Sequence, residues 1–204
     1  RSPGVYFDRQ QDRTSDKEVF GAKIIPSRGA WLEFEIDKKD QPQVRVDRKR
    51  KQSAIVFLMA IGMTKSEIAQ AFKDYPLVLD ALEKETLETQ DEALVDLYRK
   101  IRPADTPTPE AGKNLLDSFY FNTKRYDLAR VGRYKINRKL GVEADFNDRS
   151  LHQEDIIATI KYLVALHDGA ATFPGKRNGE DVDLRVDVDD IDHLSNRRVR
   201  TVGE

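Results

Sequence analysis

The first quarter of the chain alternates between short apolar runs and polar turns. Leu32, Phe34 and Ile36 alternate with glutamates, as in a strand with one buried face. The apolar runs that predict strands are residues 5–7, 19–25, 31–36 and 44–47. The polar residues 8–17 predict a loop between the first two runs. The pattern therefore favours a set of antiparallel strands over about residues 4–48.

From about residue 53 the apolar residues take helical spacing. Residues 53–61 are apolar nearly throughout, which predicts a buried helix. Residues 64–67 and 89–92 each have the spacing of a capping box, in which two side chains satisfy backbone donors at a helix start. Pro103 is expected to end the helix that follows the second box, because proline lacks a backbone N–H group.

Two further helices are predicted before residue 170. Pro109 suits a first helical turn, and the apolar residues that follow it at helical spacing are Leu115, Leu116 and Phe119. Ser150 and Gln153 are expected to cap a last helix, which Gly169 ends. The apolar face of that helix consists of Ile156, Ile160, Leu163, Val164 and Leu166.

Strands followed by helices indicate an α+β fold. Its parts in chain order are N-terminal antiparallel strands (about 4–48), a mostly helical region (about 53–169), and a C-terminal loop or hairpin returning to the strands. A length of 204 residues fits one domain. Within residues 1–204 we expect a strand part at about 1–50 and 170–204, and a helical part at about 51–169.

Composition narrows the class of protein. Charged residues make up 35% of the chain, yet the net charge is only -1, so any nucleic-acid contact has to come from local patches. The absence of cysteine excludes a disulfide framework and a thiolate metal site, and it fits a reducing cytosol. No apolar run approaches the length of a membrane span. Because the sequence begins at Arg1 and stops abruptly, we expect it to be a segment of a longer protein.

An acidic cluster near the C-terminus is one candidate for chemistry. Its members are Asp187, Asp189, Asp190 and Asp192, followed by His193. As ligands of Mg²⁺ they would suggest a metal-dependent nuclease, but their spacing matches no metal motif with a known mechanism. The favoured interpretation is a solvated turn. No nucleophile constellation or phosphate-binding loop accompanies the cluster, so we predict neither catalytic residues nor a metal site.

Basic clusters give a stronger signal. Residues 45–51 carry five cations, and three arginines lie between residues 197 and 200. A third group consists of Lys124, Arg125, Arg130, Arg133, Lys135, Arg138 and Lys139. Such cations can follow a phosphate backbone, although a solvated face is the simpler explanation. Trp31, the single tryptophan, belongs either to the core or to an exposed platform that stacks on unpaired bases.

Five strings in order carry a resemblance to a known family. They are residues 1–8 (RSPGVYFD), 24–31 (IIPSRGAW), 46–50 (VDRKR), 125–133 (RYDLARVGR) and 189–204 (DDIDHLSNRRVRTVGE). With these strings the whole chain resembles the lobe domain of the bacterial RNA polymerase β subunit, in its short actinobacterial form. The resemblance implies a non-catalytic piece of a nucleotidyltransferase, the DNA-directed RNA polymerase, that acts in transcription.

The resemblance also implies a DNA site. The lobe lines the DNA cleft, contacts the non-template strand of the transcription bubble, and helps to form a pocket for one unpaired guanine. Carried over by residue, the pocket consists of Arg1, Ile191, Asp192, Leu194 and Arg197, and Trp31 stacks on the preceding base. The Asp192 carboxylate can accept both N1–H and N2–H of guanine, a donor pair that other bases do not offer. The two chain ends should therefore meet in space.

Contacts to the DNA backbone are expected from Arg48, Arg50, Arg102 and Arg125. The chain departs from the family at Ala104 and Ser195, where glycine is usual.

Implied partners are non-template and downstream DNA, the remainder of β, the β′, α and ω subunits, and σ and transcription factors. No cofactor is expected here, because β′ binds the polymerase magnesium. We expect a cytoplasmic protein without membrane contact. The alternative function is a docking surface for σ, elongation or phage factors, which the dense mixed charge suggests.

Overall fold

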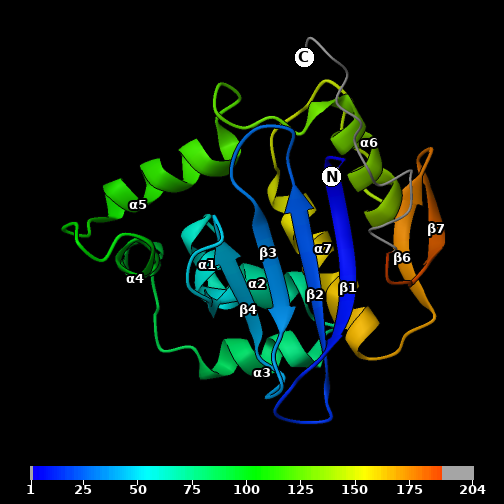
Figure 1. Ribbon diagram of the computed structural model, residues 1–204, viewed down its shortest axis with the longest axis horizontal. Coiled ribbons are helices and arrows are strands. Elements are labelled where there is room, and N and C mark those ends of the chain that lie inside the picture. The colour runs from blue at the N-terminus through cyan, green and yellow to red at the C-terminus, as the bar shows by residue number, and fades with distance from the viewer. Residues whose placement is uncertain (1, 190–204) are drawn as a thin grey trace.

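The computed structural model describes residues 2–189 and has the predicted α+β fold (Figure 1). The strands are β1 (Gly4–Gln11), β2 (Glu18–Ile25), β3 (Leu32–Ile36), β4 (Pro42–Val46), β5 (Gln52–Ser53), β6 (Thr172–Arg177) and β7 (Glu180–Arg185). The helices are α1 (Ala54–Ala60), α2 (Lys65–Ala71), α3 (Pro76–Lys84), α4 (Gln90–Ile101), α5 (Pro109–Leu116), the π-helix η1 (Asp117–Phe121), α6 (Ala129–Leu140) and α7 (Gln153–His167).

The first five strands form one antiparallel sheet in chain order. The predicted alternation in β3 is confirmed, because Leu32, Phe34 and Ile36 are all buried. The prediction of a loop over residues 8–17 is wrong in its first half, since β1 continues to Gln11. These polar residues pair with β2 beyond the core, where backbone hydrogen bonds hold a strand without apolar side chains.

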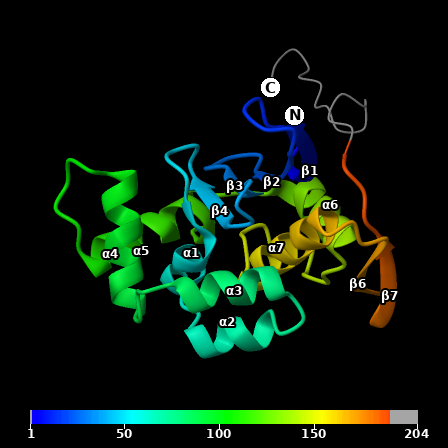
Figure 2. The same ribbon diagram turned by 90° about the horizontal axis from the view of Figure 1, so that it is seen from below.

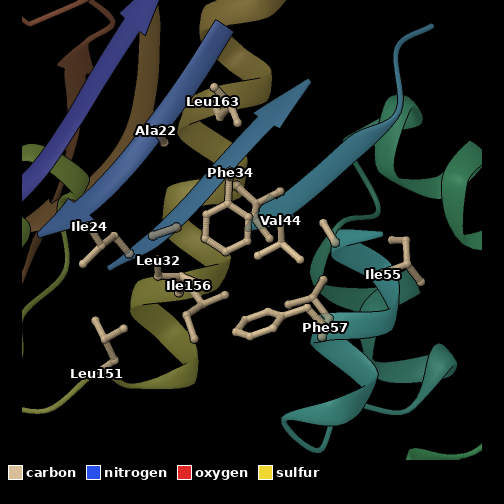
Figure 3. Close-up of a cluster of buried hydrophobic side chains, with 14 of the residues drawn as sticks. Ala22, Ile24, Leu32, Phe34, Val44, Ile55, Phe57, Leu151, Ile156 and Leu163 are labelled. Carbon is tan, nitrogen blue, oxygen red and sulfur yellow. The ribbon is translucent and has the colours of Figure 1, made fainter. Parts of the chain in front are cut away.

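One face of the sheet is covered by α7 and α1 (Figure 3). Ile156 and Leu163 of α7 lie under the strands, and Phe57 of α1 meets Phe34 edge to face, with ring centroids 6.0 Å apart. Every residue of α1 is buried, as its apolar sequence predicted. This core fixes the sheet, and with it the connections that leave the sheet edges.

The helix starts follow the predicted caps with two exceptions. The first predicted box is complete, because Thr64 and Glu67 bond each other's backbone N–H groups. In the second box only the Thr89 hydroxyl does so, since Glu92 instead accepts from the N–H of Glu88. Pro109 begins α5 as predicted.

The predicted cap of α7 is wrong. The residue before the helix is His152, not Ser150, and its N–H donates to the Asp155 carboxylate at 2.9 Å. Asp155 is at the same time the partner of Arg133 in α6, whose guanidinium reaches both carboxylate oxygens at 2.8 and 3.0 Å. Two further Arg133 donors meet the carbonyls of Asp148 and Ser150. This buried ion pair joins α6 to the start of α7.

The predicted C-terminal hairpin exists as β6 and β7. Its turn residues Asn178 and Gly179 both have positive φ, the conformation that suits a two-residue hairpin turn. The hairpin lies beside α6, on the opposite side of the molecule from α4 and α5 (Figure 2). Within the part of the chain that is described, no single helix is long and apolar enough to cross a membrane.

Replacing Arg133 with methionine should lower the free energy of unfolding by about 3–5 kcal/mol, because Asp155 would stay buried without its cation. Arg138→Met on the exposed face of the same helix is the control, with an expected change of about 0.5 kcal/mol or less. Urea unfolding of both variants measures the difference. A loss below about 1 kcal/mol for Arg133→Met would be the value of a surface pair and would contradict the assigned role.

Candidate nucleic-acid interface

Several loops of the sheet lie at the same end of its strands. Near that end Val5 of β1 pairs with Ile24, Ile24 with Leu32, and Leu32 with Val46. Neighbouring strands lie about 4.8 Å apart. The start of β1, the β2–β3 connection and the β4–β5 connection are therefore close together. We call this the basic edge, and its exposed cations are Arg28, Arg48, Lys49, Arg50, Lys124 and Arg125.

Trp31 lies at this edge and belongs neither fully to the core nor to solvent. Its ring is partly exposed, and the Arg48 guanidinium carbon lies 4.2 Å from the ring centroid. Asp47 and Arg48 both have positive φ, so the chain turns sharply after β4 and brings Arg48 back over the ring. A cation over an indole face is attracted by the ring quadrupole. The pair forms an apolar platform topped by a positive charge.

The backbone of Trp31 is held in place by hydrogen bonds to its carbonyl group. Its carbonyl accepts hydrogen bonds from the Tyr120 hydroxyl at 2.9 Å and from the N–H of Asp47 at 3.1 Å. Tyr120 is fully buried, and this burial raises the pKa of its hydroxyl far above the ordinary value. The hydroxyl therefore remains a neutral donor at all physiological pH values. The platform is thus held by the core rather than by a mobile loop.

A second loop docks on the β2–β3 connection. The carbonyl of Asp127 accepts from the N–H groups of Ser27 and Arg28, and the Asp127 N–H donates to the Arg28 carbonyl at 2.8 Å. Gly29 has φ +122°, and a Cβ there would come within 2.8 Å of the Tyr126 ring. Glycine is therefore required at this contact. The docking brings the loop that carries Arg125 against the basic edge.

The Asp127 side chain ties this loop to the chain beyond α6. Its carboxylate accepts from Arg149 Nε at 2.8 Å and from the N–H of Ala129 at 2.7 Å. The Arg149 guanidinium is the main reason why the pKa of Asp127 lies below its ordinary value. The loop geometry at the basic edge therefore depends on a charged Asp127.

The described C-terminal residues return to the N-terminal strand, as predicted. Asp189 N–H donates to the Phe7 carbonyl and the Asp189 carboxylate accepts from Phe7 N–H, both at 2.8 Å. Lys139 of α6 holds the same carboxylate at 3.0 Å. At the other end, the carbonyl of the buried Ser2 accepts from the Tyr6 hydroxyl at 2.6 Å. The chain next to Arg1 and the chain before the expected pocket are both anchored on β1.

The pocket residues themselves are Arg1, Ile191, Asp192, Leu194 and Arg197, and they lie outside the described residues. The shared site therefore stays a prediction. Of the acidic cluster, Asp189 pairs with β1 and Asp187 with Arg185. Across residues 2–189 no group of three or more acidic or histidine side chains is placed to hold a metal ion.

Two of the predicted cations, Arg102 and Arg133, do not belong to the basic edge. Arg102 is exposed at the end of α4, and the α4–α5 connection lies across the molecule from α6 (Figure 2). Arg133, which its sequence neighbourhood grouped with the DNA-facing cations, is instead completely buried. Sequence reasoning missed Arg28, a lone cation in a turn. Its position in the string 24–31, one of those that carry the resemblance, was the available signal.

Comparison with known proteins decides the family. The profile described as RNA polymerase Rpb2, domain 2, matches residues 1–174. The chain belongs to the RNA polymerase Rpb2 domain 2 family.

Relatives of this Rpb2 domain 2 chain share one name, DNA-directed RNA polymerase subunit beta. Identity over the whole chain is 98% in Bifidobacterium longum subsp. infantis, 86% in Bifidobacterium adolescentis and 61% in Paenarthrobacter aurescens. The chain spans 17% of the length of the two Bifidobacterium relatives and 18% of the third. The resemblance to the actinobacterial β subunit is therefore confirmed.

Asp127→Asn should destabilise the chain by about 1 kcal/mol at neutral pH, because the amide loses the charge-assisted bonds to Arg149. The lowered pKa means that the carboxylate stabilises the fold above its ordinary pKa and loses this effect as pH falls through the folded value. The difference between wild type and variant should therefore begin to shrink near about pH 4 and vanish only below the lowered pKa of the folded state.

Chemical unfolding at several pH values measures this difference, and Asp16→Asn, on an exposed turn, serves as the control. A difference that stayed constant on acidification would contradict the role given to the Asp127 charge.

Proposed function

We propose that the chain is the lobe domain of an RNA polymerase β subunit, a single domain over residues 1–204 that positions DNA without catalysing the reaction. In this function it lines the DNA cleft and contacts the non-template strand of the transcription bubble. Its two chain ends form a pocket for an unpaired guanine at the downstream end of the bubble. The observation that carries the proposal is the Trp31–Arg48 platform on the basic edge.

The platform has the chemistry that unpaired bases require. An indole face stacks on a base whatever its identity. Because Arg48 lies over one face of the ring, a base would take the other face or displace the guanidinium, whose charge then suits a neighbouring phosphate. A duplex base is already stacked on its neighbours, so the platform favours melted DNA. Arg28, Arg50 and Arg125 extend the positive charge along the same edge and suit a strand backbone. Arg102 would make a separate contact, because it lies at the end of α4 and not on the connections that form the basic edge.

The guanine pocket would supply base identity. Asp192 accepts both donors on the Watson–Crick edge of guanine, arginines complement its acceptors or phosphate, and Ile191 and Leu194 pack on the ring. The anchoring of Asp189 on Phe7 supports this proposal, because Asp192 follows only three residues later. Asp189 and Lys139 are then positioning residues, which hold the chain that leads into the pocket and do not contact the base.

The remaining partners follow from the place of the chain in a β subunit. They are the rest of β, the β′, α and ω subunits, and σ and transcription factors, in the bacterial cytoplasm. The polymerase magnesium would be held by β′. The chain's own contribution is to hold one strand of melted DNA in position.

Trp31→Ala in an assembled polymerase should shorten the lifetime of the open complex. Loss of one stacked base costs about 1–3 kcal/mol, so at least a fivefold faster decay is expected, with little dependence on the base. Trp31→Phe should restore part of the lifetime, because a smaller ring still stacks. Decay is followed by filter binding after competitor challenge. Equal lifetimes for Trp31→Ala and wild type would remove the platform from the proposed function.

Asp192→Ala should abolish the preference for guanine at the downstream end of the bubble, a discrimination worth about 1–3 kcal/mol. Promoters that differ only at that base are compared by open-complex lifetime. Asp183→Ala, at an exposed hairpin position, is the matched control and should keep the preference. If the Asp192→Ala enzyme still distinguished guanine to the same degree, the pocket assignment would be wrong.

A further inference from the structure

A second surface lies on the side of α6 that faces away from the sheet. It is a groove of about 820 Å³ between α6, the loop after it and the β6–β7 hairpin. We call it the α6 groove, and its lining includes Arg130, Tyr134, Arg138, Glu143, Phe146 and Arg177. The proposed DNA site uses none of these residues, although Arg130 lies within the string 125–133.

The sequence of α6 divides the helix into two faces. Gly132, Arg133 and Ile136 are buried toward the sheet and α7. Arg130, Tyr134 and Arg138 follow one another at steps of four residues, so they form a single stripe on the opposite face. All three are exposed. The groove wall is therefore a regular helix face and not a chance gathering of side chains.

The other walls are fixed to this helix by hydrogen bonds. Asn137 donates its side-chain amide to the Ala144 carbonyl at 2.8 Å, which holds the loop after α6. Lys176 N–H donates to the Gly141 carbonyl at 2.8 Å, and Gly179 N–H donates to the Glu143 carboxylate at 2.9 Å. These bonds hold the hairpin against the helix. The groove therefore exists before any ligand binds.

The groove contains an exposed aromatic pair. Tyr134 and Phe146 are 49% and 46% exposed, with ring centroids 6.1 Å apart. Together with Val131 they are the large hydrophobic side chains that the described part of the chain exposes to solvent. Isolated exposed apolar residues are ordinary, but two adjoining rings in a groove are typical of an interaction site.

The charge around the aromatic pair is mostly positive. Among the described residues, Arg130, Arg138 and Arg177 have no ion-pair partner within 4.0 Å, whereas the Glu143 carboxylate already accepts a backbone N–H. The groove thus offers three available guanidinium groups around an apolar centre. Guanidinium groups pair with carboxylates in a bidentate geometry and are favoured at protein interfaces.

We propose that the α6 groove binds an acidic peptide segment of another protein, with one aromatic or large aliphatic residue of that segment on the Tyr134–Phe146 pair. A nucleic acid fits less well, because its phosphates repeat along an extended backbone, whereas the three guanidinium groups surround a single apolar centre. The two rings also pack against each other, which suits an apolar side chain better than base intercalation. The proposal does not depend on DNA binding at the basic edge.

Short fluorescein-labelled peptides carrying one tryptophan flanked by aspartate and glutamate test the proposal by fluorescence anisotropy with the 204-residue chain. Matched probes replace the tryptophan by alanine, the acids by lysine, or the peptide by a thymidine oligonucleotide. The acidic tryptophan peptides should bind most tightly. Arg138→Glu and Arg177→Glu should each weaken them about tenfold by reversing a charge in the groove. Tyr134→Ser with Phe146→Ser should weaken them similarly.

Arg13→Glu, an equal charge change on a distant exposed turn, and Trp31→Ala at the basic edge should leave peptide affinity within about twofold. Thermal unfolding of each variant verifies its fold, and the two charge reversals lie on separate elements, so one misfolded variant does not end the test. The proposal is overturned if the acidic peptides do not bind, or if both charge reversals leave binding unchanged. Tighter binding of the oligonucleotide, lost in the same variants, would assign the groove to nucleic acid instead.

Discussion

The buried ion pair between Arg133 and Asp155 is the contact on which the α6 groove and the anchoring of Asp189 depend. Burying a guanidinium costs several kcal/mol unless its donors are all satisfied, and here carboxylate and carbonyl oxygens surround it. These partners come from the start of α7 and from the loop before it. The pair therefore fixes α6 relative to the helix that fills the sheet's inner face. Once α6 is fixed, Lys139 meets Asp189 and the outer stripe faces solvent.

The basic edge uses the same principle on a smaller scale, because its exposed groups are positioned by buried ones. Trp31 is partly exposed, but its carbonyl is held by Tyr120, which belongs to the core. Arg48 reaches the ring through two residues in the left-handed region, a conformation that persists only when the surroundings enforce it. A platform built this way loses little conformational entropy on binding a base, which favours affinity.

The sequence was sufficient where a property is local and failed where it depends on distant partners. Alternation identified β3, and the full apolar run identified α1, because each is set by which side chains are buried. The extension of β1 to Gln11 could not be foreseen, since only pairing with β2 makes it a strand. In the sequence, nothing distinguishes Arg133 from the exposed cations near it. Its burial, and the transfer of the α7 cap from Ser150 to His152, both follow from Asp155, twenty-two positions away.

At the candidate site the same limit applies. The prediction that Trp31 and the two chain ends lie close together came from the resemblance and not from periodicity. The described part of that arrangement ends at Asp189, whose carboxylate accepts from Phe7 N–H. Adjacent residues of α6 then serve the two surfaces, because Lys139 holds Asp189 while Arg138 lines the groove. Coupling between the two sites would require the helix to move. Arg133 opposes such movement, since any shift would separate a desolvated charge from its partners. A ligand in the α6 groove should therefore add a contact without altering the affinity for DNA.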